Sequence, residues 1–356
     1  MTTFLQLHLL TSYPPACLNR DDLNRPKTAM MGGVPRLRIS SQSLKRAWRT
    51  SEQFEASLKN HVGTRTKLMG VQVYQHLTKA GVAESKAKEW TQAIAAQFGK
   101  LKAKKQDAPL NDLEIEQLAH FSPEETAAIF DLATKLAEEG RAPTEDELKL
   151  LREKHKAADI ALFGRMLADS PKYNVEAACQ VAHAVTVHRA AVEDDFFTAV
   201  DDLNTREEDA GSAHMGEQGF GAGLFYVYLC INCDLLKANL NDDTELAGKA
   251  IRALIDAATK VAPTGKQNSF ASRAWAYYGL AEKGSRQPRS LSLAFMKPVR
   301  EGDMLTDAAK ALETMRGNLD KVYYEGKAES SKCFNAVTGE GLFRELLNWA
   351  ADCGEA

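Results

Sequence analysis

Cations gather between Asn19 and Arg49, and this part of the sequence is the best suited to binding chemistry. The stretch reads NRDDLNRPKTAMMGGVPRLRISSQSLKRAWR. Eight lysines and arginines stand against Asp21 and Asp22, a net charge of +6, whereas the whole chain carries −3 and the remainder therefore −9. Positive charge gathered at one place in an acidic chain indicates a surface for a polyanion. The eight cations are Arg20, Arg25, Lys27, Arg36, Arg38, Lys45, Arg46 and Arg49.

Two pairs of adjacent carboxylates, Asp21 with Asp22 and Asp201 with Asp202, suggest a different chemistry. Carboxylate oxygens bind Mg²⁺, so either pair would suit a metal-dependent ribonuclease. Neighbouring residues of a strand point to opposite faces, and neither pair forms a two-carboxylate site unless a loop bends it. Asp21 and Asp22 have a second interpretation, in which they pair with nearby arginines and order the loop. We therefore expect no catalytic or metal-binding residue, with the nuclease as the alternative.

Cysteine and histidine offer little further chemistry. Six cysteines in 356 residues are too sparse and scattered for a disulfide scaffold. Cys230 and Cys233 form a single CxxC in a run that alternates like a strand, so we expect neither zinc nor redox chemistry there. His183 and His188 do not share a strand face, and we interpret both as structural.

The cations must be positioned by a loop, a short strand and a helix. A loop rich in Asn, Asp, Pro and Gly leads into the alternating run RLRIS, after which Ser40 or Ser41 caps a helix. Helical spacing puts Leu44, Ala47 and Trp48 on one side of that helix. Phosphate oxygens would meet the free N–H groups of the first turn and the side chains of the opposite side. That opposite side carries Gln42, Lys45, Arg46 and Arg49.

Composition is that of an ordinary soluble protein, with 44% hydrophobic and 26% charged residues. No apolar run approaches the roughly 20 residues that cross a bilayer, and the N-terminus lacks the features of a secretory signal. We expect a cytoplasmic protein with no membrane partner.

Periodicity outlines the remaining elements. Residues 4–12 alternate like a strand with one buried side, and residues 60–155 are Ala-rich and helical. A capping box predicts a helix from Ser122 to Gly140, and Thr144 with Glu147 predicts the start of another. Alternation returns at 159–166 and at 179–187, where a helix is also compatible with the second run. Further helices are expected at about 243–260 and near the C-terminus.

A glycine-rich span follows residue 192. We expect residues 196–203 and 224–231 to form its two arms, joined by a connection with five glycines. Taken together, the elements predict an α+β fold with a ferredoxin-like core, like that of RNA-recognition modules, carrying two insertions.

Five strings in order, NRDDLNRPKTAMMGG, RLRISSQSLKRAWR, DIALFGRM, FFTAVDDL and GSAHMG, resemble the CasC family of repeated backbone subunits of the type I-E CRISPR complex Cascade. The resemblance implies an RNA-recognition-motif-like palm, a helical fingers domain and a projecting β-hairpin thumb. It places the palm at 1–59, 156–191 and 234–356, the fingers at 60–155 and the thumb at 192–233. It implies no cofactor and no enzymatic activity.

The same resemblance implies a filament of copies along CRISPR RNA (crRNA). Its partners would be crRNA, the target DNA strand paired to it, other copies of this chain and other Cascade subunits. The thumb would kink the RNA at regular intervals, and the exposed bases would pair with target DNA. A third hypothesis, a generic single-strand binder, predicts steep salt dependence and no fixed stoichiometry.

Site residues are also implied by the resemblance. Met166 would wedge against bases, which tolerates any guide sequence because every base has a π face. Arg165 would either contact RNA or hold its loop, and Met166 and Phe197 have the alternative of filling the core. The residues expected to hold the RNA backbone are Arg20, Lys27, Ser40, Gln42, Lys45, Arg46 and Arg49, with Lys266 and Gln267 as further candidates. The thumb residues expected at a turned-out nucleotide are Phe197, Thr198 and Val200.

Overall fold

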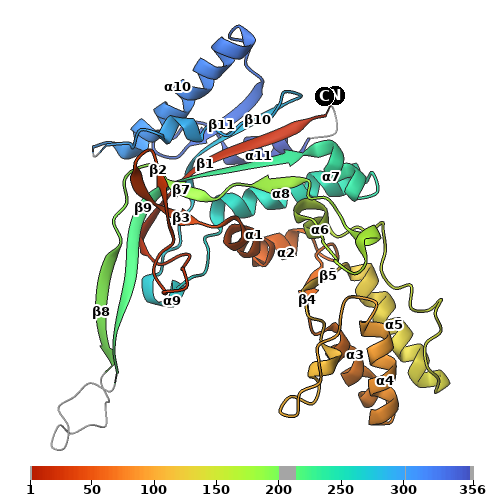
Figure 1. Ribbon diagram of the computed structural model, residues 1–356. Helices are drawn as coiled ribbons and strands as arrows, with labels where there is room; N and C mark the ends of the chain where they lie inside the picture. Colours follow the sequence, from red (N-terminus) through yellow and green to blue (C-terminus); the bar gives the residue numbers. More distant parts are fainter. Residues whose placement is uncertain (1, 200–213, 301, 353–356) are drawn as a thin grey trace, which may run out of the picture. The chain divides into compact units, whose positions relative to one another are not determined.

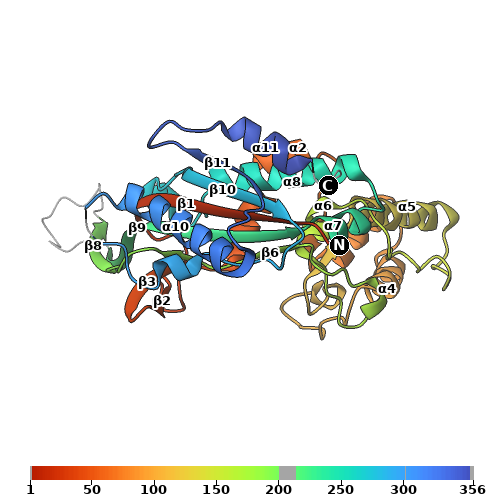
Figure 2. The same ribbon diagram turned by 90° about the horizontal axis from the view of Figure 1, so that it is seen from above.

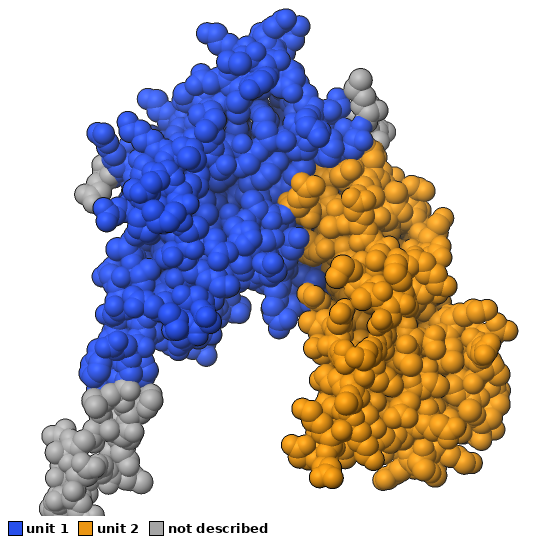
Figure 3. Space-filling view, in the orientation of Figure 1, with its two compact units in different colours: residues 1–54, 181–230, 251–356 blue, residues 55–180, 231–250 orange. Residues whose placement is uncertain are grey.

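The α+β architecture is confirmed, and the chain divides into two compact units. The structure, a computed structural model, describes residues 2–199, 214–300 and 302–352 (Figure 1). Unit 1 comprises residues 1–54, 181–230 and 251–356, and unit 2 comprises residues 55–180 and 231–250 (Figure 3). Each unit is therefore assembled from segments far apart in the sequence.

One large sheet forms the centre of unit 1. Within the described residues it has nine strands, and its main path runs β11–β10–β1–β9–β7–β3–β2, with β6 and β8 also pairing with β9. β1 pairs antiparallel with β10, from Phe4 opposite Gly284 to Leu10 opposite Tyr278. The strands are β1 (Phe4–Ala16), β2 (Thr28–Met31), β3 (Val34–Ile39), β6 (Cys179–Val181), β7 (Ala184–Thr186), β8 (Glu193–Ala199), β9 (His214–Asn232), β10 (Ala276–Gly284) and β11 (Ser330–Asn335).

Helices lie on both sides of this sheet. On one side are η3 (Ser292–Phe295) and α10 (Met304–Tyr324), which pack on Leu10, Tyr278 and Leu280 (Figures 1 and 2). On the other side, α11 (Phe343–Ala351) contacts β10 and β11. Also present are α1 (Ser41–Arg49), α2 (Glu52–Ser57), α8 (Thr244–Lys260) and α9 (Gln267–Phe270), and the helices predicted near 243–260 and the C-terminus are confirmed as α8 and α11.

The expectation of one buried side for the first strand is wrong. Leu7 is buried as predicted, but Gln6 and His8 on the other face are buried as well. β1 lies between β10 and β9 in the middle of the sheet, and α10 covers its second face. The polar residues there are accommodated by hydrogen bonds, which is the usual condition for burying them.

Glu282 is the centre of this buried polar cluster. Its carboxylate accepts hydrogen bonds from His8 Nε2 at 3.2 Å, Arg289 at 3.2 Å and Arg316 Nε at 2.8 Å. Burial lowers the pKa of His8, so the neutral ring donates from Nε2 to Glu282, and its Nδ1 lies 2.9 Å from the Tyr226 hydroxyl. Burial alone would raise the pKa of Glu282, but the His8 hydrogen bond and the charge of Arg289 outweigh it and hold the pKa at about 2.

Stability should therefore depend on Glu282 in acid. Because its folded-state pKa is depressed, its contribution is complete above the ordinary value of 4.5 and is lost as the pH falls toward about 2. Urea unfolding measured across this window should show a steeper loss for the wild type than for Glu282→Gln. The exposed Glu345→Gln is the matched control. If the free energy of unfolding fell equally with pH in Glu282→Gln and the wild type, Glu282 would not be the source of the acid sensitivity.

Unit 2 is built mainly from three helices around one core. The core includes Val73, Trp90, Ile94, Phe121 and Leu132. Its elements include β4 (Thr64–Thr66), α3 (Met69–Lys79), α4 (Glu84–Ala95), β5 (Ala119–Phe121), α5 (Pro123–Glu139), α6 (Ala158–Phe163) and α7 (Cys233–Asn239), with the short turns η1 (Asn111–Leu113) and η2 (Pro171–Tyr173).

Capping signals in unit 2 are only partly confirmed. The Ser122–Glu125 capping box starts α5, and Gly140 ends it in the left-handed conformation. Thr144 and Glu147 also exchange the reciprocal hydrogen bonds of a capping box, but no helix follows. Glu147 also pairs with Arg141 and Lys135, and the box closes a turn.

Two runs of alternating residues had different outcomes. The strand predicted at 159–166 is wrong, because residues 158–163 form α6. Residues 158–162 are all buried, and a short buried run has no exposed face from which its period can be told. The second run forms β6 and β7, and the helical alternative is excluded.

A hairpin follows residue 192, but its pairing differs from the prediction. β8 begins at Glu193 and pairs with residues 214–220 of β9, with Phe197 opposite Gly216. Residues 224–231 belong to β9 within the large sheet, where Tyr226 pairs with Val185 of β7. Gly216, Gly219, Gly221 and Gly223 therefore lie within a strand. No helix among the described residues has the length and apolar character needed to cross a membrane.

Candidate nucleic-acid interface

The loop between β1 and β2 is ordered by its own polar side chains. Asp21 Oδ1 accepts hydrogen bonds from the backbone N–H groups of Leu23 at 3.0 Å and Arg25 at 2.9 Å. Asn24 adopts the left-handed conformation and accepts a hydrogen bond from Arg20 at 2.6 Å. Asp21 therefore orders the loop, but through backbone N–H groups and not by the expected pairing with an arginine, because Arg20 bonds to Asn24 and Arg25 pairs with Asp194.

Asn19 joins this loop to α1. Its side-chain oxygen accepts a hydrogen bond from Ser40 N at 2.9 Å, and its carbonyl accepts one from Lys27 N at 2.9 Å. Ser40 is the N-cap, because its hydroxyl accepts from Ser43 N. Leu44 and Trp48 are buried on one side of α1, as predicted, whereas Ala47, predicted on the same side, is half-buried and lines a groove beside this helix.

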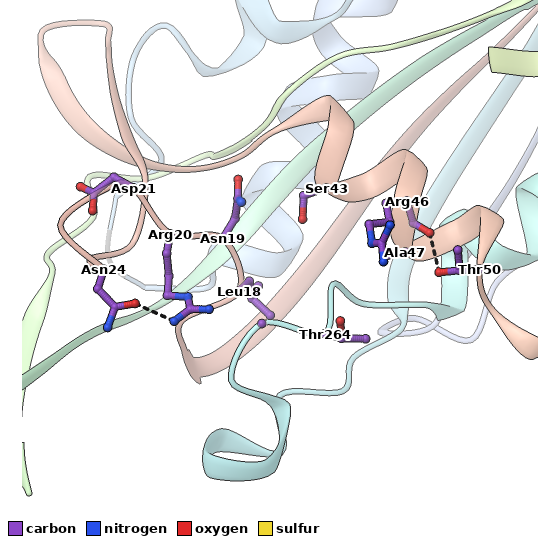
Figure 4. Close-up of a pocket in the computed structure, with 11 residues that line it drawn as sticks. Leu18, Asn19, Arg20, Asp21, Asn24, Ser43, Arg46, Ala47, Thr50 and Thr264 are labelled. Atoms are coloured by element: carbon purple, nitrogen blue, oxygen red, sulfur yellow. Dashed lines mark hydrogen bonds between the residues drawn. The ribbon is translucent and has the colours of Figure 1, made fainter. Parts of the chain in front are cut away.

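A groove runs between the loop and α1 (Figure 4). Its volume is about 480 Å³. Figure 4 shows the Arg20 and Arg46 side chains toward its two ends, with the Ser43 hydroxyl between them. Two guanidinium groups flanking a hydroxyl suit an anionic backbone, because both phosphate and sugar oxygens find donors. The groove is lined by Leu18, Asn19, Arg20, Asp21, Asn24, Ser43, Arg46, Ala47, Thr50, Thr264 and Gly265.

The segment before α9 closes the groove. A side chain at Gly265 would lie 2.3 Å from the carbonyl oxygen of Leu18, so only glycine lets the two backbones meet. Lys266 follows in the left-handed conformation, and Gln267 begins α9. Burial raises the pKa of the Cys17 thiol, and the charges of Arg20 and Lys266 oppose this rise.

The predicted cations do not all reach the groove. Ser43, Arg46, Ala47 and Thr50 line it, so of the predicted helix residues only Arg46 takes part. Gln42, Lys45 and Arg49 lie on the adjoining side of α1. Lys27 does not line the groove, and its backbone carbonyl accepts a hydrogen bond from Arg38 N of β3 at 2.8 Å. Burial lowers the pKa of His183, and the charges of Arg38 and Lys27 lower it further.

Ser43 and Thr50 were missed by the sequence analysis. Ser43, Arg46 and Thr50 are spaced i, i+3 and i+7, which puts them on one face of a helix. This spacing could have revealed them. Thr264 had no such signal, because the fold alone brings it to α1.

Arg36 corrects the charge count of the basic stretch. The side chain is fully buried and donates to the backbone carbonyls of Met31, Thr186 and Phe295 at 2.8–3.2 Å. Burial lowers its pKa. Arg36 therefore stabilises the fold of unit 1 and does not contribute to a polyanion surface.

The base of the β8–β9 hairpin contacts both the β1–β2 loop and α9. Arg25 of the loop forms a 2.9 Å ion pair with Asp194 of β8. On β9, the ring of Phe220 lies 6.0 Å from that of Phe270 in α9. The loop, α9 and the hairpin thus form one continuous surface of unit 1.

Phe197 projects from the hairpin over a glycine. A side chain at Gly216 would lie 2.6 Å from the Phe197 ring, so glycine makes room for it. Phe197 is 41% exposed, which excludes the core-filling alternative. Thr198 is exposed beside it. Val200, Asp201 and Asp202 lie outside the described residues.

Met166 belongs to unit 2 and is also exposed, by 75%, so it does not fill the core. Its neighbour Arg165 is buried and ion-paired with Glu125 at 2.7 Å. Arg165 also donates to the carbonyls of His120, Arg152 and Tyr173. The predicted RNA contact of this guanidinium is wrong, because its donors are already engaged in holding the loop.

In the described part of the chain, no group of three or more His, Cys, Asp and Glu side chains is placed to hold a metal ion. Cys230 and Cys233 are buried thiols without a disulfide. Burial raises the pKa of Cys230 to about 11.

Comparison with known proteins adds a family and a fold. The sequence profile of the family described as CT1975-like protein matches residues 5–345. A chain of a structure titled "CRISPR RNA-guided surveillance complex, pre-nicking" is 28% identical, with a TM-score of 0.85 over 99% of this chain and 100% of that chain. Another, titled "CRISPR RNA-guided surveillance complex", is 21% identical, with a TM-score of 0.73 over 98% and 99%, and it supports the fold alone. Among curated proteins, no match was found.

Proposed function

Because this chain belongs to the CT1975-like protein family, we propose that it is the crRNA-binding backbone subunit of a type I-E CRISPR Cascade complex. The observation that carries the proposal is the 28% identity, over the whole of both chains, to a chain from a CRISPR RNA-guided surveillance complex. Unit 1 would supply the ferredoxin-like palm, unit 2 the fingers and the β8–β9 hairpin the thumb.

The groove supports binding of the RNA backbone. Arg20 and Arg46 provide positive charge toward its two ends, and its lining includes the hydroxyl-bearing residues Ser43, Thr50 and Thr264. These groups recognise phosphate and sugar, which are common to every guide sequence. A protein that must carry many different guides needs contacts of this kind.

The exposed Phe197 and Met166 support a role at the bases. An aromatic ring and a thioether contact any base through its π face. In the proposed complex they kink the crRNA at regular intervals, and the bases between kinks stay open for the target DNA strand. Several copies of the chain would follow one another along the spacer, beside other Cascade subunits.

We propose a non-catalytic role for this subunit. Asp21, which lines the groove, is engaged by two backbone N–H groups of its own loop. This engagement favours a structural function for Asp21 over Mg²⁺ chemistry. The guide bound beside it must also stay intact.

Co-purification tests the proposal. The chain is expressed with a CRISPR array and its neighbouring genes, and bound RNA is sized and sequenced. We expect guide-length RNA in a large particle with several copies of the chain. An RNA-free monomer, or degradation of added RNA only with Mg²⁺, would contradict the proposal and favour the nuclease.

Phe197→Ala should alter the RNA and leave the protein folded. The ring is partly exposed, so its loss should change the melting temperature little, whereas the regular pattern of RNA protection against nuclease should become irregular. Tyr323→Ala, which removes an exposed ring of α10, is the control and should leave the pattern unchanged. A large loss of thermal stability in Phe197→Ala would return Phe197 to a structural role.

A further inference from the structure

Trp275 is an exposed tryptophan that the proposed contacts do not use. It is 68% exposed, whereas Trp48 and Trp90 are buried and Trp349 is half-buried. Leaving so large an apolar ring in water is unfavourable, and tryptophan is usually well buried. Such exposure indicates a binding partner for the ring.

The ring is supported from behind. The Lys260 ammonium lies 5.6 Å from the centre of the Trp275 ring and 5.0 Å from that of Phe343. Phe343 in turn packs edge-to-face on the buried Phe334 of β11, with ring centres 5.4 Å apart. Lys260 is itself paired with Asp256 at 2.5 Å. A ring held this way is already restrained, so it loses little further conformational freedom on binding.

Trp275 is linked to the groove wall through its contact with Lys260. Lys260 ends α8 four residues before Thr264 of the groove wall, and four residues span at most about 14 Å. Burial alternates along the segment that precedes β10, because Ser272 is buried whereas Arg273 and Trp275 are exposed. Arg273 and Trp275 are therefore both accessible on this stretch of the surface.

We propose that Trp275 is a stacking platform for an unpaired nucleobase of single-stranded nucleic acid that extends from the groove. Arg273 beside it would meet a phosphate of the same strand. An aromatic ring with flanking cations is the composition of sequence-tolerant single-strand sites, since every base offers a π face. The inference rests on the proposed RNA-binding function and adds a contact to it.

Tryptophan fluorescence of the full-length chain tests this site. An unstructured single-stranded RNA oligonucleotide should quench part of the emission of the wild type, and Trp275→Phe should abolish that part while RNA still binds. An oligonucleotide of the same length with abasic positions should quench less. The control is Trp349→Phe, because Trp349 also stacks under a lysine, with Lys283 at 4.9 Å, but is less exposed.

Affinity provides the second readout. Trp275→Ala should bind the RNA about tenfold more weakly, and Trp275→Phe should retain most of the affinity. Unchanged quenching and affinity in both variants would overturn the stacking site while the groove function stands. Normal RNA affinity with lost association between copies would also overturn it and assign Trp275 to a protein contact. Absence of RNA binding by the wild type would instead contradict the proposed function.

Discussion

Replacing Arg20 and Arg46 together with alanine should weaken RNA binding about 100-fold at moderate salt. The two guanidinium groups lie toward opposite ends of the groove, so each is expected to contact a different phosphate. Loss of two phosphate contacts on a single strand should also reduce the slope of log K against log salt by about 1.4. Binding titrations over a salt series measure both quantities.

The control for this variant removes two cations from the opposite side of the sheet. Lys310 and Lys321 are exposed on α10, and Lys310→Ala with Lys321→Ala changes the net charge by the same amount. This control should leave the salt slope unchanged. Equal losses in both variants would mean that net charge, not the groove, governs binding. An unchanged slope for the Arg20 and Arg46 variant would exclude both residues as phosphate contacts.

Arg165→Met should strongly destabilise unit 2. It leaves the carboxylate of Glu125 in the interior without its cation, which costs about 3–5 kcal/mol. Because Glu125 also closes the capping box of α5, the loss should reach that helix. Thermal unfolding and hydrogen exchange of the α5 amides measure it.

A second substitution identifies the cause. Glu125→Gln in the Arg165→Met background removes the unpaired charge and keeps a side chain that can complete the capping box. It should recover much of the lost stability. Stability that stays low in the double variant would indicate that the packing of Arg165, and its bonds to three carbonyls, matter more than the charge. A stable Arg165→Met protein would refute the assignment altogether.

Arg165 also belongs to the loop that carries Met166. The backbones of Arg165 and Val175 exchange two hydrogen bonds, at 3.0 and 2.9 Å, and Leu167 N donates to Asn174 at 2.6 Å. Arg165 anchors this loop in the interior, while Met166 projects from it. Arg165 therefore holds the loop from which Met166 projects, which is the second of the two interpretations that the sequence allowed.

Elements with local causes were predictable from sequence. The cap of α1, the capping box of α5 and the left-handed Gly140 depend on residues within one or two turns of each other, and all three are confirmed. The first strand was also found, because alternation is a local pattern. The family resemblance, which rests on ordered short motifs, is confirmed by the match over residues 5–345.

Predictions failed where packing or pairing with other segments determines the local structure. Burial of α6 on all sides erased the helical period at 159–166. In the hairpin, Phe197 lies over Gly216 of the opposite strand, a pairing that only the fold reveals.

Sequence by itself determined where positive charge concentrates, which helix carries it and which family the chain belongs to. Only the tertiary structure decided which cations are available to a ligand. Arg36 lies within the basic stretch, yet carbonyls from residues 186 and 295 surround it, whereas Thr264 and Gly265, more than 200 positions from α1, complete the groove. The physical reason is that the role of a side chain depends on its burial and its partners, which are set by segments that only the fold brings together.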